Sequence, residues 1–118
     1  MIRGEIFYGR KNSDAIHPIV FLKNYDEDFF VGAMLTHSSL FKDNILMKTE
    51  YFKTISENGL VHKLRCNNTH LVKAKLLKRN DWHPFIKIGE LTEEGIEFVE
   101  RNVNSELEKL WEDYLSGN

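Results

Sequence analysis

Residues 17–39, HPIVFLKNYDEDFFVGAMLTHSS, contain two apolar runs on either side of an acidic turn. The first run begins with His-Pro, and proline is tolerated at the first residue of a strand. Because the short segment YDEDFF joins two strand-like runs, we predict an antiparallel hairpin. An antiparallel pair places the start of its first strand beside the end of its second. We therefore expect His17 to lie next to Thr36, His37 and Ser38.

Further strand-like segments occur on both sides of this hairpin. They are GEIFYG (4–9), NILMKTEYFK (44–53), LVHKLRC (60–66) and THLVKAKLL (69–77). Asn58-Gly59, between the second and third segments, is a strong turn signal. In the fourth segment Val72, Ala74 and Leu76 share one parity, which is typical of a half-buried strand. The pattern predicts five to seven short antiparallel strands that form a small barrel over about residues 1–90.

The spacing of apolar residues changes near Thr92, which is a candidate N-cap followed by Glu93 and Glu94. Apolar residues then recur at steps of three and four, which predicts an amphipathic C-terminal helix over about residues 92–115. Asn102, Asn104 and Ser105 are positions where this helix would bend or break. The residues of the apolar stripe are Ile96, Val99, Val103, Leu107, Leu110, Trp111 and Tyr114.

Length and composition are typical of one globular domain, which we place at 1–118. No apolar run approaches the roughly 18 residues that span a bilayer, so we expect no membrane association. The N-terminal MIRGEIFYGR lacks the apolar core of a signal peptide, and the single cysteine, Cys66, excludes an internal disulfide. These features predict a cytoplasmic protein.

The net charge of −2 is unevenly distributed along the chain. Residues 42–87 carry ten basic and four acidic side chains, whereas residues 88–118 carry two basic and nine acidic ones. The basic block includes KLRCNNTHLVKAKLLKR (63–79), which could face a polyanion or could simply be a solvated strand face. The acidic C-terminal part argues against indiscriminate binding to duplex nucleic acid.

The sequence lacks a phosphate-binding glycine loop, paired cysteines and the histidine spacings of zinc sites, so we expect no metal and no cofactor. What remains is the polar group at the hairpin mouth, which Thr69 and His70 could join from a neighbouring strand. Cleavage of RNA by attack of the 2′-hydroxyl needs proton-transfer groups and donors that stabilise the charged phosphorane. Histidine titrates near neutral pH and suits proton transfer, while hydroxyls and Lys73 suit phosphate contact. The alternative is that these histidines only cap strand ends.

Several of these motifs, taken together and in order, resemble the MazF/PemK (Kid) toxin family over about residues 3–104. The family's first strand, of type GDI-aromatic, resembles RGEIFYG. Its second strand, of type RPVVV-S-N, resembles HPIVFLKN, and its third, which ends in LTS or ITS, resembles VGAMLTHS. NTHLVKAKLLKR resembles a later strand of type QIRTLDKKRL, and IKIGELTEEGIEFVERNV resembles the segment that enters the last helix. The likeness is collinear, and its closing IGELTEEGIEFV is its most specific part.

The resemblance implies an SH3-like barrel of the MazF/CcdB type with a C-terminal helix, usually as a homodimer. It also implies metal-independent cleavage of single-stranded RNA and inhibition by a cognate antitoxin protein. The family's catalytic pair is an arginine before the proline and a threonine or serine at the end of the next strand. Thr36 matches the second member, but His17 stands where the family has arginine. Histidine cannot clasp phosphate bidentately, so either His17 acts in proton transfer while Lys73 or Arg65 grips phosphate, or activity is changed.

The segment RKNSDAI between the first two strands is shorter than the family's loop, so its RNA preference cannot be transferred. Trp82-His83-Pro84 places aromatic bulk where a base could stack. Our leading hypothesis is an endoribonuclease with His17 and Thr36 as catalytic residues. Its expected substrate-binding residues are His37, Ser38, Arg65, Thr69, His70 and Lys73. The rival hypothesis is a non-catalytic SH3-like barrel that binds nucleic acid or peptide, and a third is a structural protein that associates through its acidic helix.

Overall fold

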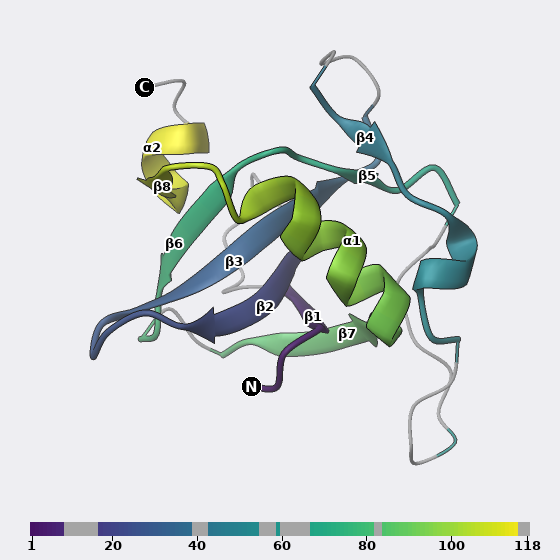
Figure 1. Ribbon diagram of the computed structural model, residues 1–118. Helices are drawn as coiled ribbons and strands as arrows, with labels where there is room; N and C mark the ends of the chain where they lie inside the picture. The colour runs from purple at the N-terminus through teal and green to yellow at the C-terminus, as the bar shows by residue number, and fades with distance from the viewer. Residues whose placement is uncertain (9–16, 39–42, 55–58, 60–66, 82–83, 116–118) are drawn as a thin grey trace.

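The computed structural model describes residues 1–8, 17–38, 43–54, 59, 67–81 and 84–115, and it is mainly β (Figure 1). Three strands come first, followed by two short strands that flank a 3-10 helix, two longer strands, and a C-terminal part of mixed structure. In chain order the elements are β1 (Glu5–Tyr8), β2 (Ile19–Asn24), β3 (Phe29–Thr36), β4 (Ile45–Leu46), η1 (Thr49–Tyr51), β5 (His70–Leu71), β6 (Lys75–Arg79), β7 (Ile86–Glu90), α1 (Glu93–Val103), β8 (Glu108–Leu110) and α2 (Trp111–Leu115).

The predicted hairpin is confirmed: β2 and β3 pair antiparallel, with Ile19 opposite Met34. Its acidic turn is held by the carboxylate of Asp26, which accepts hydrogen bonds from the backbone N–H groups of Asp28 and Phe29, both at 2.8 Å. Such a local acceptor favours a tight turn over continued strand. The backbone N–H of Leu35 donates to the carbonyl of Pro18 at 2.9 Å, so the pairing continues toward the hairpin mouth.

Both faces of this hairpin are buried, which explains why its strands are apolar at nearly every position. Alternate residues on β2 and β3 pack into two different apolar clusters, because successive side chains of a strand point to opposite faces. One cluster contains Val20, Leu22, Val31, Ala33 and Leu35, together with Ile96, Val99 and Val103 of α1. The other contains Ile19, Phe21, Phe30 and Met34, together with Trp111. Figure 1 shows α1 lying across the first of these faces.

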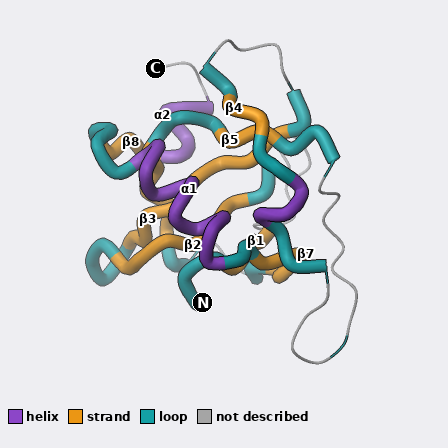
Figure 2. Tube along the Cα trace, turned by 45° about the vertical axis from the view of Figure 1, so that its right-hand side comes forward, coloured by secondary structure: helices purple, strands orange, loops and turns teal. Residues whose placement is uncertain are grey.

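The eight strands of the described residues form one sheet that is not closed by strand pairing. Its order is β4-β5-β3-β2-β1-β7, and β6 pairs with the first half of β3 while β5 pairs with its end. Seven strands pair antiparallel, and β8 lies parallel to β6. An isolated bridge between Phe52 and Leu91 brings the segment after β4 to the end of β7. The sheet is therefore strongly curled, as the tube in Figure 2 shows.

The predicted C-terminal helix over 92–115 is wrong in its second half. Thr92 is the N-cap, as expected, and its hydroxyl accepts a hydrogen bond from the backbone N–H of Gly95 at 3.2 Å. However, α1 ends at Val103, directly before the Asn104 and Ser105 that the sequence marked as breakers. The chain then forms β8 on the edge of β6 and one turn of helix, α2, beyond it. Leu107 is 83% exposed, so the apolar stripe does not continue through it.

Two other predicted strands are shorter than expected. In the segment 44–53 only β4 is a strand, and the chain then turns into η1. The segment 69–77 is divided into β5 and β6, because the backbone N–H of Ala74 donates to the carbonyl of Val72 at 2.8 Å and interrupts the pairing with β3. The predicted strand 60–66 and Asn58 of the predicted turn lie outside the described residues. Gly59 is described and has a φ of 79°, as a turn glycine can.

Candidate functional site

A cavity of about 420 Å³ lies at the mouth of the β2–β3 hairpin. Extending the strand register by two residues from the Ile19–Met34 pair places His17 opposite Thr36, and both residues line the cavity. The structure therefore brings together the two residues that the sequence placed at the centre of the site. The described residues that line it are His17, Met34, Thr36, Asn44, Val72, Tyr114 and Leu115.

Thr36 is buried at the end of β3, and its hydroxyl group has a defined partner. The oxygen Oγ1 accepts a hydrogen bond from the backbone N–H of Ser38 at 3.1 Å. A threonine hydroxyl that accepts in this way keeps its own O–H as a donor. Asn44 holds the same turn from the other side, because its side-chain Nδ2 donates to the carbonyl of Ser38 at 3.1 Å. Thr36 is thus held at the cavity by its local backbone.

His70, Thr69 and His37 lie beside the cavity but do not line it. His70 pairs with Thr36 across β3 and β5, and it is buried. Its ring Nδ1 lies 3.0 Å from the backbone carbonyl of Asn68, and since a carbonyl can only accept, Nδ1 carries the proton. Thr69 is buried, and its Oγ1 lies 3.4 Å from Nε2 of the exposed His37. These side chains make up a polar layer behind Thr36.

Lys73, one of the two cationic residues expected to grip phosphate, does not line the cavity. Lys73 is exposed on the irregular backbone between β5 and β6, next to the lining residue Val72. Arg65, Trp82 and His83 lie outside the described residues. Among the described residues that line the cavity, His17 is the one side chain that can carry a positive charge.

Much of the basic block is neutralised by neighbouring carboxylates. Lys78 contacts Glu112 at 2.7 Å and Arg79 contacts Asp81 at 3.0 Å. Further along the chain, Lys87 contacts both Glu5, at 2.7 Å, and Glu90, at 2.8 Å. Of the two interpretations of 63–79, a surface that faces a polyanion is therefore not favoured at Lys78 and Arg79, whose charges are already compensated. Lys75 donates to the backbone carbonyl of Asn104 at 2.6 Å and so supports the link between α1 and β8.

Two residues of the cavity come from α2, at the far end of the chain from the hairpin. Tyr114 and Leu115 lie against the cavity because Trp111, three residues earlier, is buried in the cluster that contains Ile19 and Met34. The sequence placed Tyr114 on an apolar helical stripe, which predicted its packing but not its place at the site. Nothing in the sequence pointed to Asn44.

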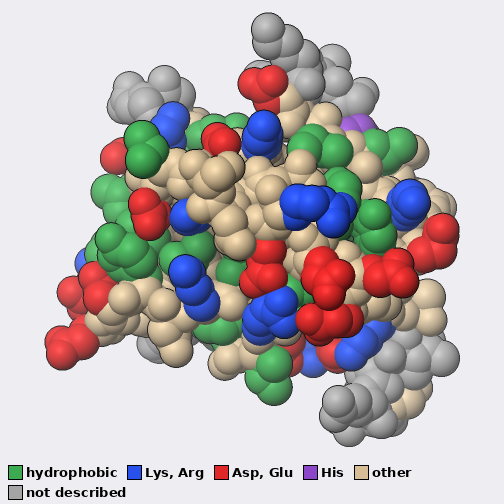
Figure 3. All heavy atoms as spheres, viewed as in Figure 1, with side chains coloured by type: hydrophobic (Ala, Val, Ile, Leu, Met, Phe, Trp, Pro, Cys, Tyr) green, Lys and Arg blue, Asp and Glu red, His purple; other side chains and the backbone are tan. Residues whose placement is uncertain are grey.

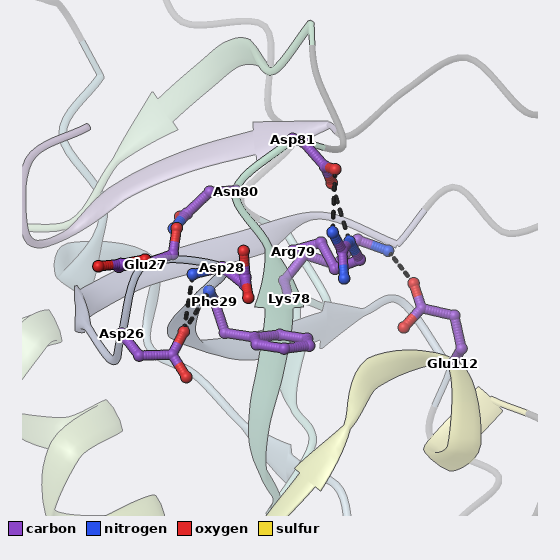
Figure 4. A network of polar contacts seen from close by, with 9 residues as sticks. All are labelled: Asp26, Glu27, Asp28, Phe29, Lys78, Arg79, Asn80, Asp81 and Glu112. Atoms are coloured by element: carbon purple, nitrogen blue, oxygen red, sulfur yellow. Dashed lines mark hydrogen bonds and ion pairs between the residues drawn. The ribbon is translucent and has the colours of Figure 1, made fainter.

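A buried lysine on β6 fixes the position of α2. The side chain of Lys78 is 2% exposed, and its Nζ contacts Oε1 of Glu112 on α2 (Figure 4). The same ammonium lies 5.3 Å from the ring centroid of Trp111, within cation–π range. Burial lowers the pKa of Lys78, and the hydrogen bond and charge of Glu112 partly oppose this shift. Burial also raises the pKa of Tyr114, and the nearby carboxylate of Asp43 adds to the effect.

A larger hollow of about 540 Å³ lies on the side of the molecule that bears the N-terminal end of α1. Its lining includes Arg3, Glu5, Lys53, Lys87 and Glu90, and most of these charges are paired with one another. Arg3 additionally contacts Glu93 at 3.2 Å and Glu100 at 2.7 Å on α1. Figure 3 shows acidic and basic side chains intermixed on the face that carries α1. Because its carboxylates would repel phosphate, we regard the smaller cavity as the candidate site.

Within the described part of the chain no group of three or more His, Cys, Asp or Glu side chains is placed to hold a metal ion. No helix among these residues is long and apolar enough to cross a membrane. Comparison with protein-family models, with curated proteins and with solved structures finds no significant match to this chain.

Proposed function

We propose that the protein is a metal-independent endoribonuclease of the MazF/PemK type that cleaves single-stranded RNA at the cavity between His17 and Thr36. The observation that carries the proposal is the position of these two residues on one cavity at the hairpin mouth. The collinear sequence motifs support it independently. With them the proposal includes an SH3-like barrel, a homodimeric assembly, and a role as the toxin that a cognate antitoxin protein inhibits.

The chemistry assigns one role to each central residue. The imidazole of His17 takes the proton from the 2′-hydroxyl as the 2′-oxygen forms a bond to the adjacent phosphorus. The O–H of Thr36 donates to a phosphoryl oxygen, whose negative charge grows in the transition state. The bond from phosphorus to the 5′-oxygen breaks, and the leaving oxygen takes a proton from water. The products are a 2′,3′-cyclic phosphate and a 5′-hydroxyl.

A second candidate function is that of a non-catalytic binding module. It is favoured by the apolar part of the cavity lining, Met34, Val72 and Leu115, and by His17 being its one described residue that can become cationic. Binding a ligand in such a cavity needs no cationic side chain besides His17, whereas stabilising a charged phosphorane usually takes more than one.

Incubation of the purified protein with a long single-stranded RNA in EDTA distinguishes the two functions. The enzyme is expected to give discrete fragments whose 3′ ends carry a 2′,3′-cyclic phosphate. EDTA chelates divalent metal ions and so inactivates any contaminating metal-dependent nuclease. RNA that is bound but not cut would contradict the enzyme and support the binding module. A small acidic protein encoded directly beside this one, which abolishes cleavage on addition, would support the toxin assignment.

A further inference from the structure

The lining of the candidate cavity combines two chemical types of residue. His17, Thr36 and Asn44 are polar and lie around the hairpin mouth, whereas Met34, Val72, Tyr114 and Leu115 are apolar or aromatic. A volume of about 420 Å³ falls within the range of roughly 300–1,000 Å³ that small-ligand sites occupy. A lining with both polar and apolar residues suits a nucleotide, which joins a charged phosphate and sugar to a flat base.

Tyr114 is the aromatic residue of the described lining. It is half-buried, so part of its side chain packs against the apolar cluster while part borders the cavity. A tyrosine hydroxyl is protonated at neutral pH, and the raised pKa of Tyr114 is in keeping with this, so the ring itself carries no negative charge. Aromatic rings of this kind are the usual platforms on which single-stranded nucleic acids stack their bases.

The short helix that carries this ring is anchored to the rest of the fold. Trp111 on the same short helix is 3% exposed, and Glu112 is tied to the buried Lys78 on β6. Both anchors precede Tyr114 by three residues or fewer, so they restrict its movement relative to β3. Because the backbone that carries the ring is already ordered, ligand binding need not order that segment first.

We propose that this cavity is a single-nucleotide site in which the ring of Tyr114 stacks on a nucleobase while Thr36 and His17 contact the adjoining phosphate. The inference rests on the proposed function and adds to it a base-binding residue from the C-terminal helix. Tyr114 contacts the ligand in this arrangement, but takes no part in proton transfer.

Binding of fluorescently labelled 2′-O-methyl RNA decamers tests this inference separately from cleavage, because a methylated 2′-oxygen cannot attack phosphorus. The variant Tyr114→Leu keeps an apolar side chain in the packed position and removes the aromatic face. Tyr114→Phe keeps the ring, and Tyr25→Leu changes a tyrosine that is 50% exposed in the β2–β3 turn and absent from the cavity. Thermal unfolding of each variant checks that the fold is retained.

We expect Tyr114→Leu to weaken binding roughly 5- to 100-fold, the range observed for loss of one stacked base. Tyr114→Phe and Tyr25→Leu should bind within about twofold of the parent protein. Equal binding by Tyr114→Leu and the parent would overturn the inference, and so would a parent that binds none of the decamers. If the parent cleaves unmodified RNA while Tyr114→Leu binds unchanged, the proposed function stands and only the base-binding role of Tyr114 is lost.

Discussion

The ammonium of Lys78 on β6 lies 2.7 Å from a carboxylate oxygen of Glu112 on α2, although the lysine side chain is 2% exposed and the glutamate 58% exposed. A buried charge that loses its partner pays a desolvation cost without compensation. This asymmetric pair, together with the buried Trp111, therefore helps to hold α2, with Tyr114 and Leu115, against the cavity.

Glu112→Gln should destabilise the protein by about 1–3 kcal/mol, less than for a fully buried pair because water reaches Glu112. Lys78→Met should lower the free energy of unfolding by less. It removes the buried charge, keeps a similar side-chain volume, and leaves on Glu112 a carboxylate that water can solvate. Urea unfolding of both variants measures the two free energies. A larger loss of stability in Lys78→Met than in Glu112→Gln would contradict the prediction.

Lys78 should also make stability depend on alkaline pH. Its pKa in the folded protein is below the ordinary 10.5, chiefly because of burial. Between the two values the unfolded chain binds more protons than the folded one, so the free energy of unfolding rises with pH across that window. We expect the parent protein to gain stability relative to Lys78→Met as the pH rises toward 10.5, the ordinary pKa of lysine. A constant difference between the two proteins would show that Lys78 has no lowered pKa.

Gly95 allows α1 to approach η1 closely. A Cβ atom at this position would collide with the backbone carbonyl of Tyr51, to which the N–H of Thr92 donates at 2.8 Å. Alanine is normally a better helix former than glycine. Here, however, Gly95→Ala should destabilise the protein by roughly 1–3 kcal/mol, because α1 must move to make room for the Cβ atom. Glu97→Ala, at an exposed position of the same helix, should change stability by less than about 0.5 kcal/mol. Denaturant midpoints that are equal for the two variants would contradict this account of the contact.

The hairpin and the placement of His17 opposite Thr36 followed from the sequence because strand period and turn chemistry act locally. The apolar runs 19–24 and 29–36 form β2 and β3, and Asp26 closes the turn between them. Thr92 was likewise recognisable as a cap, since capping depends on a few adjacent residues.

The C-terminal part could not be derived in this way, because its structure depends on distant partners. Leu107 and Leu110 continue a helical spacing, yet they are 83% and 40% exposed, and Leu110 belongs to β8, which pairs with β6 as a parallel edge strand. Lys78 continues the parity of Ala74 and Leu76, and this was a signal that it faces the core. The return of Glu112 and Trp111 supplies partners with which a lysine can remain there. The place of Tyr114 at the cavity depends on the same return of the chain.

Thr36 should contribute to RNA cleavage through its O–H. The bond from the N–H of Ser38 uses a lone pair of Oγ1, so the O–H can still donate. Thr36→Val keeps the shape of the side chain and should reduce RNA cleavage roughly 100- to 1,000-fold, as loss of one transition-state donor does. Thr36→Ser retains the hydroxyl and should retain most of the activity. Initial rates on one labelled RNA, with thermal unfolding as a control, compare the variants. Similar rates for valine and threonine would exclude the hydroxyl from the reaction.

The most direct test of the central claim is the rate of RNA cleavage in EDTA by the parent protein and by His17→Ala. Lys73→Ala serves as the control, because Lys73 is exposed and does not line the cavity. We predict that the parent releases fragments ending in 2′,3′-cyclic phosphate and that His17→Ala lowers this rate at least about 100-fold while remaining folded. Lys73→Ala should remain near the parent rate. Cleavage by His17→Ala at the parent rate would contradict the claim that His17 and Thr36 form the reactive centre.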